Sequence, residues 1–153
     1  MTMAITLRKY LADNGVAYDI LSHPYTSSSQ GTAMAARIPA ERIAKSVVLE
    51  DEKGYLMAVV PASAHVKIGK LNQVVNRHLG LATEPELEGL FTDCATGAIP
   101  PVGEAYGMTT VIDGSLDGHE DIYFEAGDHK DLIHVKGSSF RKLMRNAQHA
   151  HIC

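Results

Sequence analysis

Apolar side chains repeat at the spacing of an α-helix in two segments of the chain. The first helix is predicted to begin at Thr6, as its cap, and to end at Gly15. Its apolar positions follow i, i+3, i+4 spacing: Leu7, Tyr10 and Leu11. The clearest helix is predicted over residues 67–79. Its buried stripe consists of Ile68, Leu71, Val75 and Leu79, and its polar flank of Lys70, Gln73 and Arg77.

Shorter helices are predicted from their end signals. Residues 29–36 form one such segment, and Pro39 suits the first turn of another over residues 40–43. Thr83 and Glu86 have the spacing of a capping box. Ser138 is expected to cap the last helix. That helix would bury Phe140, Leu143 and Met144, and would share Arg141, Lys142 and Arg145 on its outer face.

Alternating or continuous apolar runs predict strands between these helices. Residues 16–22 alternate, with Tyr18 and Ile20 on one face, and His23-Pro24 ends the run. A hairpin is predicted from residues 45–50 and 55–60 across the turn at residues 51–54. Three more strands are expected near residues 109–112, 122–125 and 132–135. Because strands and helices do not alternate strictly, the pattern indicates an α+β or mixed α/β fold around a curved sheet.

The length of 153 residues predicts a single domain spanning residues 1–153. Hydrophobic residues make up 45% and charged residues 21%, which is typical of a globular protein, and no apolar run reaches the length of a membrane span. Residues 1–8 lack the layout of a signal peptide. The two cysteines, Cys94 and Cys153, form no disulfide framework, which favours a cytoplasmic location.

The charge balance limits the kind of nucleic-acid contact that is possible. The chain has 14 basic and 18 acidic residues, a net charge of −4. Proteins that coat nucleic acids or bind DNA broadly depend on many phosphate contacts, which this balance disfavours. It is compatible with an enzyme that binds only the end of an RNA.

The segment from Asp93 to Gly103 contains unusual backbone chemistry. Pro100 and Pro101 lack a backbone donor and have fixed φ, so this segment is neither a helix nor a central strand. Gly97 and Gly103 can adopt positive φ or allow another chain to approach closely. The segment is therefore predicted to be a stiff loop with outward-facing main-chain groups that hold a ligand, or else an ordinary connector.

Three segments together resemble the YbaK/prolyl-tRNA-synthetase editing-domain family. Residues 44–49 (AKSVVL) resemble the family's strand that carries its functional lysine, and residues 97–103 (GAIPPVG) resemble its glycine-x-x-x-proline substrate loop. Residues 124–127 (FEAG), residues 132–135 and the helix from Ser138 resemble its closing segment. With His23-Pro24, the resemblance extends in the right order over nearly the whole chain. It implies a mixed, partly closed, barrel-like sheet flanked by helices.

The resemblance also implies a set of site residues. The catalytic positions are Lys45, Gly97 and Pro101. The substrate-binding positions implied are Ser46, Ala98, Ile99, Pro100, His65, Gly127, Asp128 and Ser139. Relatives often carry an acidic residue about where Ser139 stands, and Asp128 is a candidate to replace it. The chain has no attached synthetase domain, so it resembles the freestanding editing proteins.

Lys45 is the residue for which the strand pattern matters most. Alternation places it on the same face as Val47 and Leu49, opposite Ser46. It could be a strand-end lysine with its stem on apolar surface, a fixed positive charge that stabilises developing negative charge, or a base with a lowered pKa. Ser46 faces the other way, so a direct catalytic role is not expected. The resemblance makes it a candidate for specificity, because relatives vary at this position.

No metal or cofactor is predicted. His149, His151 and Cys153 have alternate spacing, but they lie in a tail expected to fray, whereas structural zinc requires four ligands on a fixed scaffold. Cys94 has no recognisable base partner, and His129 is expected to be a surface histidine in a turn. Nucleophile-elbow, Walker, zincin and dinucleotide motifs are absent from the sequence.

Two functions are compatible with these observations. The first is a deacylase that hydrolyses the ester of a mischarged tRNA, with tRNA-Pro carrying a small amino acid as the expected substrate and with transient contact to a synthetase. The second is a non-catalytic module of the same fold that binds tRNA ends or a nucleotide. Neither involves DNA or a membrane, and the sequence indicates no particular oligomeric state.

Overall fold

The computed structural model describes residues 3–25 and 28–153, so residues 1–2 of the N-terminal segment and residues 26–27 lie outside the description. The helices are α1 (Ile5–Asp13), α2 (Ser29–Ala36), α3 (Ile68–Val75), α4 (Glu84–Leu90) and α5 (Gly137–Leu143), with the 3-10 turns η1 (Ala40–Arg42), η2 (Gly103–Tyr106) and η3 (Gly114–Leu116). The strands are β1 (Asp19–Ser22), β2 (Ala44–Asp51), β3 (Gly54–Pro61), β4 (Gly80–Leu81), β5 (Thr109–Asp113), β6 (Asp121–Glu125), β7 (Asp131–Lys136) and β8 (Gln148–Ala150).

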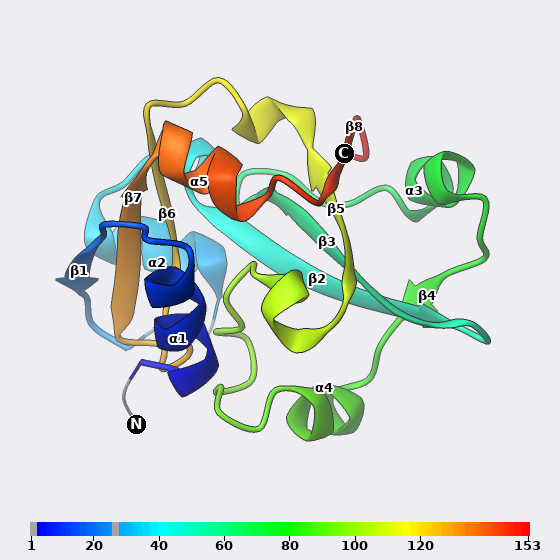
Figure 1. The fold of residues 1–153 in the computed structure, drawn as a ribbon, viewed down its shortest axis with the longest axis horizontal. Helices are drawn as coiled ribbons and strands as arrows, with labels where there is room; N and C mark the ends of the chain where they lie inside the picture. The colour runs from blue at the N-terminus through cyan, green and yellow to red at the C-terminus, as the bar shows by residue number, and fades with distance from the viewer. Residues whose placement is uncertain (1–2, 26–27) are drawn as a thin grey trace.

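The strands form two sheets. A three-stranded antiparallel sheet has the order β1-β7-β6, and a five-stranded mixed sheet has the order β4-β2-β3-β5-β8. A bridge between Ile43 and Tyr123 joins the start of β2 to β6. Figure 1 shows the large sheet crossing the molecule, with α1 in front of the small sheet and α3 at the opposite end. The predicted α+β class with a mixed sheet flanked by helices is confirmed, although the sheet does not close.

The hairpin of β2 and β3 is the centre of the core. Its register pairs Asp51 with Gly54, as the turn residues predict. Alternation sends Met57 and Val59 of β3 into the cluster under α1 and α5, and sends Leu56, Ala58 and Val60 into the cluster under α3. Both faces of β3 are therefore buried, which explains its continuous apolar sequence.

Two predicted helix caps are wrong. Thr6 lies inside α1, and its main-chain N–H donates to the Asp93 carboxylate 87 residues away. The helix α5 begins at Gly137 after Lys136, without a side-chain cap from Ser138. The capping box of Thr83 and Glu86 is confirmed. A tertiary contact thus replaces the local cap at α1.

The helix predicted over residues 67–79 is shorter than expected. α3 ends at Val75 because Asn76 adopts the left-handed conformation with φ of 54°. Arg77 therefore lies outside the helix, where its guanidinium binds the Asp51 carboxylate and the Gly54 carbonyl oxygen. Lys70 and Arg77 do not share a helix flank, and Arg77 is committed to the hairpin turn.

The ends of the chain also differ from the prediction. β1 begins only at Asp19, as an edge strand, and its Ile20 side chain is exposed. The C-terminal segment does not fray: β8 pairs in parallel with β5, and Ile152 is completely buried. These contacts involve residues more than 35 positions apart, which local patterns do not reveal.

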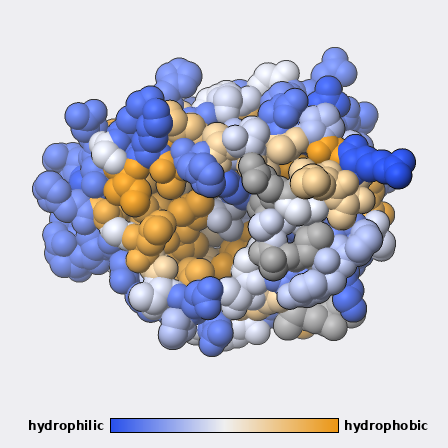
Figure 2. Space-filling model, turned by 180° about the vertical axis from the view of Figure 1, so that it is seen from behind, coloured by the Kyte–Doolittle hydropathy of each residue, from blue (hydrophilic) through white to orange (hydrophobic). Residues whose placement is uncertain are grey.

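The surface carries single exposed apolar side chains as well as a broader apolar area. The exposed large hydrophobic residues come from different elements and are Ile5, Ile20, Tyr25, Met34 and Leu81. Figure 2 shows apolar area bordered by hydrophilic side chains on the face opposite that of Figure 1. None of the helices in the described part of the chain is long and apolar enough to cross a membrane.

Candidate functional site

An open strand edge lies at the centre of the candidate site. β2 pairs with β3 along its whole length, but on its other edge β4 reaches only Leu49 and Glu50. Among the described residues, no strand covers this edge between the bridge at Ile43 and β4. Ala82 N–H donates to the Val48 carbonyl oxygen there, so antiparallel alternation directs the main-chain groups of Ser46 to the same open edge.

The Gly97–Pro101 loop passes along this open edge. The Ser46 hydroxyl donates to the Ile99 carbonyl oxygen at 2.8 Å, which attaches the loop to β2. Gly97 is exposed and has φ of 85°, a conformation that favours glycine. The expectation of outward-facing groups along the whole loop is wrong, because residues 98–101 are buried. Only the Gly97 end of the loop is open to a ligand.

Other tertiary contacts hold the loop from behind. The Asp93 carboxylate accepts hydrogen bonds from Thr6 N–H at 2.8 Å and from the Tyr106 hydroxyl at 2.9 Å. Burial raises the pKa of Asp93, but these hydrogen bonds outweigh burial, so its pKa is lowered. A side chain at Gly103 would contact Thr110, which explains the need for glycine at the far end. These contacts fix the conformation of the loop.

A cavity of about 90 Å³ brings the predicted strand and loop together. Its walls come from β2, α4, β6 and the loop, and the lining residues are Ala44, Lys45, Ser46, Val48, Leu87, Gly97, Ile99 and Glu125. Four of the residues predicted for the site therefore meet here: Lys45, Ser46, Gly97 and Ile99. Pro101, Ala98 and Pro100 support the loop from buried positions and do not line the cavity.

Lys45 is half-buried beside this cavity. Burial lowers its pKa, and the Cys153 side chain acts in the opposite direction. Its neighbours at alternate positions, Val47 and Leu49, pack in the cluster under α3, as the alternation predicts. The ammonium group is therefore a cation whose hydration is reduced, and such a charge interacts strongly with a nearby anion.

Glu125 is the site residue that the sequence reasoning missed. It is only 5% exposed, it ends β6, and it lines the cavity. The Thr32 hydroxyl donates to its Oε1 atom at 2.7 Å. Burial raises its pKa, while Thr32, His23 and His129 act in the opposite direction. The only sequence signal for Glu125 is its position in the FEAG segment, residues 124–127.

Asp128, expected as a replacement acid, has a different position. Its carboxylate accepts the main-chain N–H groups of Lys130 and Asp131 at 3.0 and 2.9 Å and so closes its own turn. His129 is buried, contrary to the expectation of a surface position, and its Nε2 atom donates to the Thr96 carbonyl oxygen. Gly127 has φ of 104°, and its carbonyl oxygen accepts from Ala95 N–H. This turn supports the cavity wall and the loop.

Two predicted binding residues are not brought to the cavity. His65 is exposed in the connection between β3 and α3, and Ser139 lies on α5; neither lines the cavity beside Lys45. The helix that carries Ser139, α5, packs against the small sheet. It therefore contributes no acidic residue to the cavity beside Lys45.

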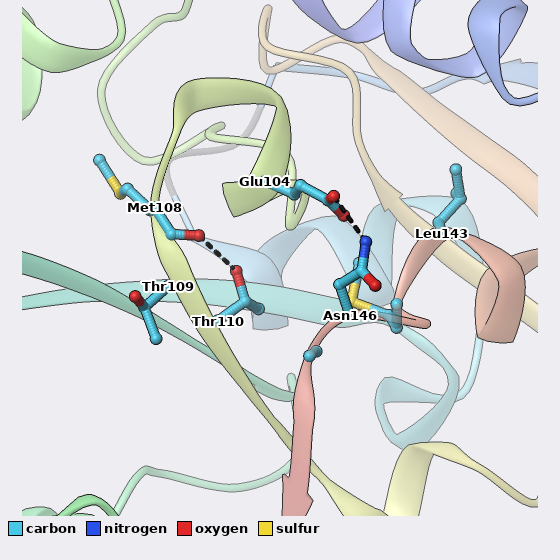
Figure 3. Close-up of a pocket in the computed structure, with 8 residues that line it drawn as sticks. Glu104, Met108, Thr109, Thr110, Leu143 and Asn146 are labelled. Carbon is cyan, nitrogen blue, oxygen red and sulfur yellow. Dashed lines mark hydrogen bonds between the residues drawn. The ribbon is translucent and has the colours of Figure 1, made fainter.

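A larger cavity of about 260 Å³ lies elsewhere, between η2, β5 and the end of α5 (Figure 3). Its polar groups satisfy one another: Asn146 donates to Glu104, and Thr110 donates to the Met108 carbonyl oxygen. Tyr10 also donates to Glu104. Because it contains no cation beside an acid or nucleophile, we place the chemistry in the smaller cavity at Lys45.

The thiols and histidines offer little alternative chemistry. Burial raises the pKa of Cys94 to about 12, so this thiol stays protonated at neutral pH and is a poor nucleophile. His149 pairs with Asp117 at 2.9 Å instead of joining His151 and Cys153. Within residues 3–25 and 28–153, no group of three or more His, Cys, Asp or Glu residues could hold a metal ion.

These features define a small α+β domain with a cation, an acid and a glycine loop around one cavity at an open strand edge. The chain belongs to the aminoacyl-tRNA editing domain family, which its residues 23–143 match. The resemblance drawn from the sequence motifs is thereby confirmed. No curated protein matches the sequence.

Solved structures agree with this assignment. A protein whose name proposes it as a trans-editing enzyme for prolyl tRNA synthetase shares 25% identity, with 96% of this chain and 94% of that chain covered and a TM-score of 0.84. A scaffold protein for the presentation of linear epitopes shares 23% identity over 97% and 96% of the chains, with a TM-score of 0.85. A hypothetical protein shares 18% identity over 96% and 98%, with a TM-score of 0.84. The last two similarities concern the fold alone.

Proposed function

We propose that this protein is a trans-editing hydrolase that removes a small, wrongly attached amino acid from tRNA. The observation that carries the proposal is the single cavity formed by Lys45, Ser46, Gly97 and Glu125. The family membership supports the reaction class, and the name of the 25% identical structure supports a tRNA-Pro substrate. The protein would act in the cytoplasm and contact a synthetase only transiently.

The aminoacyl ester is an activated bond, so the site needs no strong nucleophile. In the proposed reaction the oxygen of a water molecule bonds to the ester carbonyl carbon, the bond from that carbon to the ribose oxygen breaks, and the ribose oxygen takes a proton. The Lys45 ammonium would stabilise the negative charge that develops on the carbonyl oxygen. The Ser46 N–H at the open edge and the main chain at Gly97 are available to position the ester. The vicinal ribose hydroxyl of the substrate would help to orient the water.

The small cavity supports selection by size. Its volume of about 90 Å³ favours a small side chain over a larger one. Steric selection of this kind supplies about 1–3 kcal/mol per methylene group. Leu87, Val48 and Ile99 provide the apolar part of this wall.

A panel of mischarged tRNAs tests the proposal. The purified protein is incubated with tRNA-Pro carrying alanine, serine, cysteine or proline, and loss of the ester is measured against Lys45→Ala as the control. Hydrolysis of a small non-cognate ester by the native protein, and not by the variant, is expected. Binding of these tRNAs without ester loss would contradict an enzyme and favour a non-catalytic module that binds tRNA ends.

A further inference from the structure

One carboxylate oxygen of Glu125, a residue that lines the cavity, has no hydrogen-bond partner among the described residues. Its Oε1 atom accepts a hydrogen bond from Thr32, but its Oε2 atom is buried and has no hydrogen-bond partner among the described residues. A buried carboxylate with an unpaired oxygen is costly and rare in a folded protein. The same side chain lines the cavity with Gly97 and Ile99.

The residues around Glu125 do not neutralise it fully. The His23 side chain is completely buried. Its Nε2 atom lies 3.8 Å from Glu125 Oε1, beyond hydrogen-bond distance, and has no hydrogen-bond partner among the described residues. The Nδ1 atom of His23 is 2.7 Å from the Pro24 carbonyl oxygen, so that nitrogen carries the ring proton and donates it. At 3.8 Å, Nε2 gives Glu125 no hydrogen bond, whichever charge the ring carries.

Lys45 is not the missing partner either. It lines the same cavity, yet none of the ion pairs among the described residues joins it to Glu125. The strand alternation carries the Lys45 side chain toward Val47 and Cys153, whereas Glu125 enters from β6. Lys45 and Glu125 therefore both line the cavity without pairing with each other.

We infer that Glu125 binds the α-ammonium group of the aminoacyl ester, and this inference rests on the proposed function. An ammonium group has three donors and a positive charge, which match an unpaired carboxylate oxygen in a site of reduced hydration. The ester carbonyl of the same substrate would lie toward Lys45. Glu125 and Lys45 would then interact with the two ends of the aminoacyl group. The site would thus select aminoacyl esters that have a free α-ammonium group, and it would reject α-hydroxyacyl esters and N-acylated aminoacyl esters.

Two matched substrates test the inference. Alanyl-tRNA is converted with nitrous acid to lactyl-tRNA, which replaces the ammonium group by a hydroxyl of similar size. The native protein should hydrolyse alanyl-tRNA with a kcat/KM about 10- to 100-fold higher than lactyl-tRNA, the range for losing a hydrogen bond to a charged group. Rates are corrected for the spontaneous hydrolysis of each ester. Equal corrected values for the native protein would overturn the inference without any variant.

The variant Glu125→Gln tests whether Glu125 causes the preference for alanyl-tRNA over lactyl-tRNA. The matched control is Glu120→Gln, on the exposed loop before β6. Glu125→Gln should bring the ratio of the kcat/KM values for alanyl-tRNA and lactyl-tRNA close to one, while Glu120→Gln keeps the native ratio. An equal loss on both substrates would show a structural role and overturn the inference.

A binding measurement separates this inference from the proposed function. The probes are 3′-deoxy-3′-(alanylamido)adenosine and its lactylamido counterpart, which resist hydrolysis. If the native protein hydrolyses no ester but binds the alanyl probe at least tenfold more tightly than the lactyl probe, the proposed function fails and the ammonium site stands. If binding does not distinguish the probes, the ammonium site is wrong.

Discussion

Lys45 and Asp93 show how single side chains acquire different roles from similar degrees of burial. Lys45 lies at an open strand edge beside the cavity, and burial lowers its pKa. Asp93 lies behind the loop, where hydrogen bonds from Thr6 and Tyr106 stabilise its charged form. The first charge is available to a ligand, whereas the second is already satisfied by the protein. We therefore expect catalysis to depend on Lys45 and stability to depend on Asp93.

Lys45→Ala should lower deacylation by on the order of 10²-fold or more, the effect of losing an electrostatic stabiliser. The melting temperature and circular dichroism should change little, because the side chain makes no hydrogen bond that the structure records among its described residues. Lys53→Ala, in the exposed hairpin turn, is the matched control. Full activity of Lys45→Ala would contradict the mechanism.

Asp93→Asn should lower the free energy of unfolding at pH 7 by about 1.5–3 kcal/mol, the range for hydrogen bonds to a charged group. The pKa of Asp93 is lowered in the folded protein, so its contribution is present above the ordinary value of 3.8 and is lost as the pH falls through the folded value. Urea unfolding at pH 7, 5 and 3 measures this. The difference in the free energy of unfolding between the native protein and the variant should be smaller at pH 3 than at pH 7. A difference that does not change with pH would show that the charge of Asp93 is not its cause.

At the scale of elements, the site results from the meeting of an unpaired strand edge and a glycine loop. β4 is too short to cover β2, and Ser46 attaches the loop at the uncovered stretch. Gly97 can take φ of 85° without a steric penalty, which leaves the main chain open at the cavity. The open edge and the positive φ together create the space that a substrate would enter.

Gly97→Val should reduce both substrate binding and turnover in a protein that still folds, because a β-branched side chain at positive φ costs about 1–2 kcal/mol and displaces the main chain. Gly107→Val provides the control, since Gly107 also has positive φ, 72°, and a side chain there meets no atoms. Kinetics and melting of both variants are compared. If both variants bind and turn over the substrate equally well, the Gly97 loop is only a connector between elements.

For the whole molecule, the C-terminus adds the edge strand β8 to the large sheet and supports the face that carries Lys45. Ile152 N–H donates to the Asp113 carboxylate at 2.9 Å, and its side chain fills the cluster under α3. Arg141 and Lys142 of α5 are exposed on the outer surface, and so is Arg145, just after the end of that helix. Stability is therefore expected to involve the C-terminal strand, and RNA contact is expected to involve α5.

Deleting residues 149–153 should lower the free energy of unfolding by about 2–5 kcal/mol, the range for losing one large buried apolar side chain. The full-length protein should remain active with a chelator. His149→Ala with His151→Ala, which retains Ile152, is the control for the histidines. Activity lost on chelation and restored by zinc would contradict metal independence.

Reversing Lys142 and Arg145 to glutamate should raise KM for aminoacyl-tRNA with little change in kcat, if α5 contacts the acceptor stem. The slope of log affinity against log salt should flatten by about one unit per lost phosphate contact. Lys9→Glu on α1 is a matched exposed control. An unchanged KM and salt slope would confine recognition to the aminoacyl end.

The sequence by itself determined the features that depend on local physics. Period-two alternation placed Val47 and Leu49 opposite Ser46, turn residues placed the hairpin, and the order of the lysine strand and the glycine-proline loop indicated the family. Alternation and turn formation depend on neighbours within a few residues, so the local pattern is sufficient for them.

Only the tertiary structure decided which groups face the cavity. Glu125, and not Asp128 or Ser139, supplies the acid, because β6 ends beside β2 while Asp128 closes its own turn. Asp93 takes over the cap of α1, and β8 pairs with β5 across more than 35 residues. Each of these contacts joins segments far apart in the chain, where the energy of burial and pairing, and not local propensity, selects the partner.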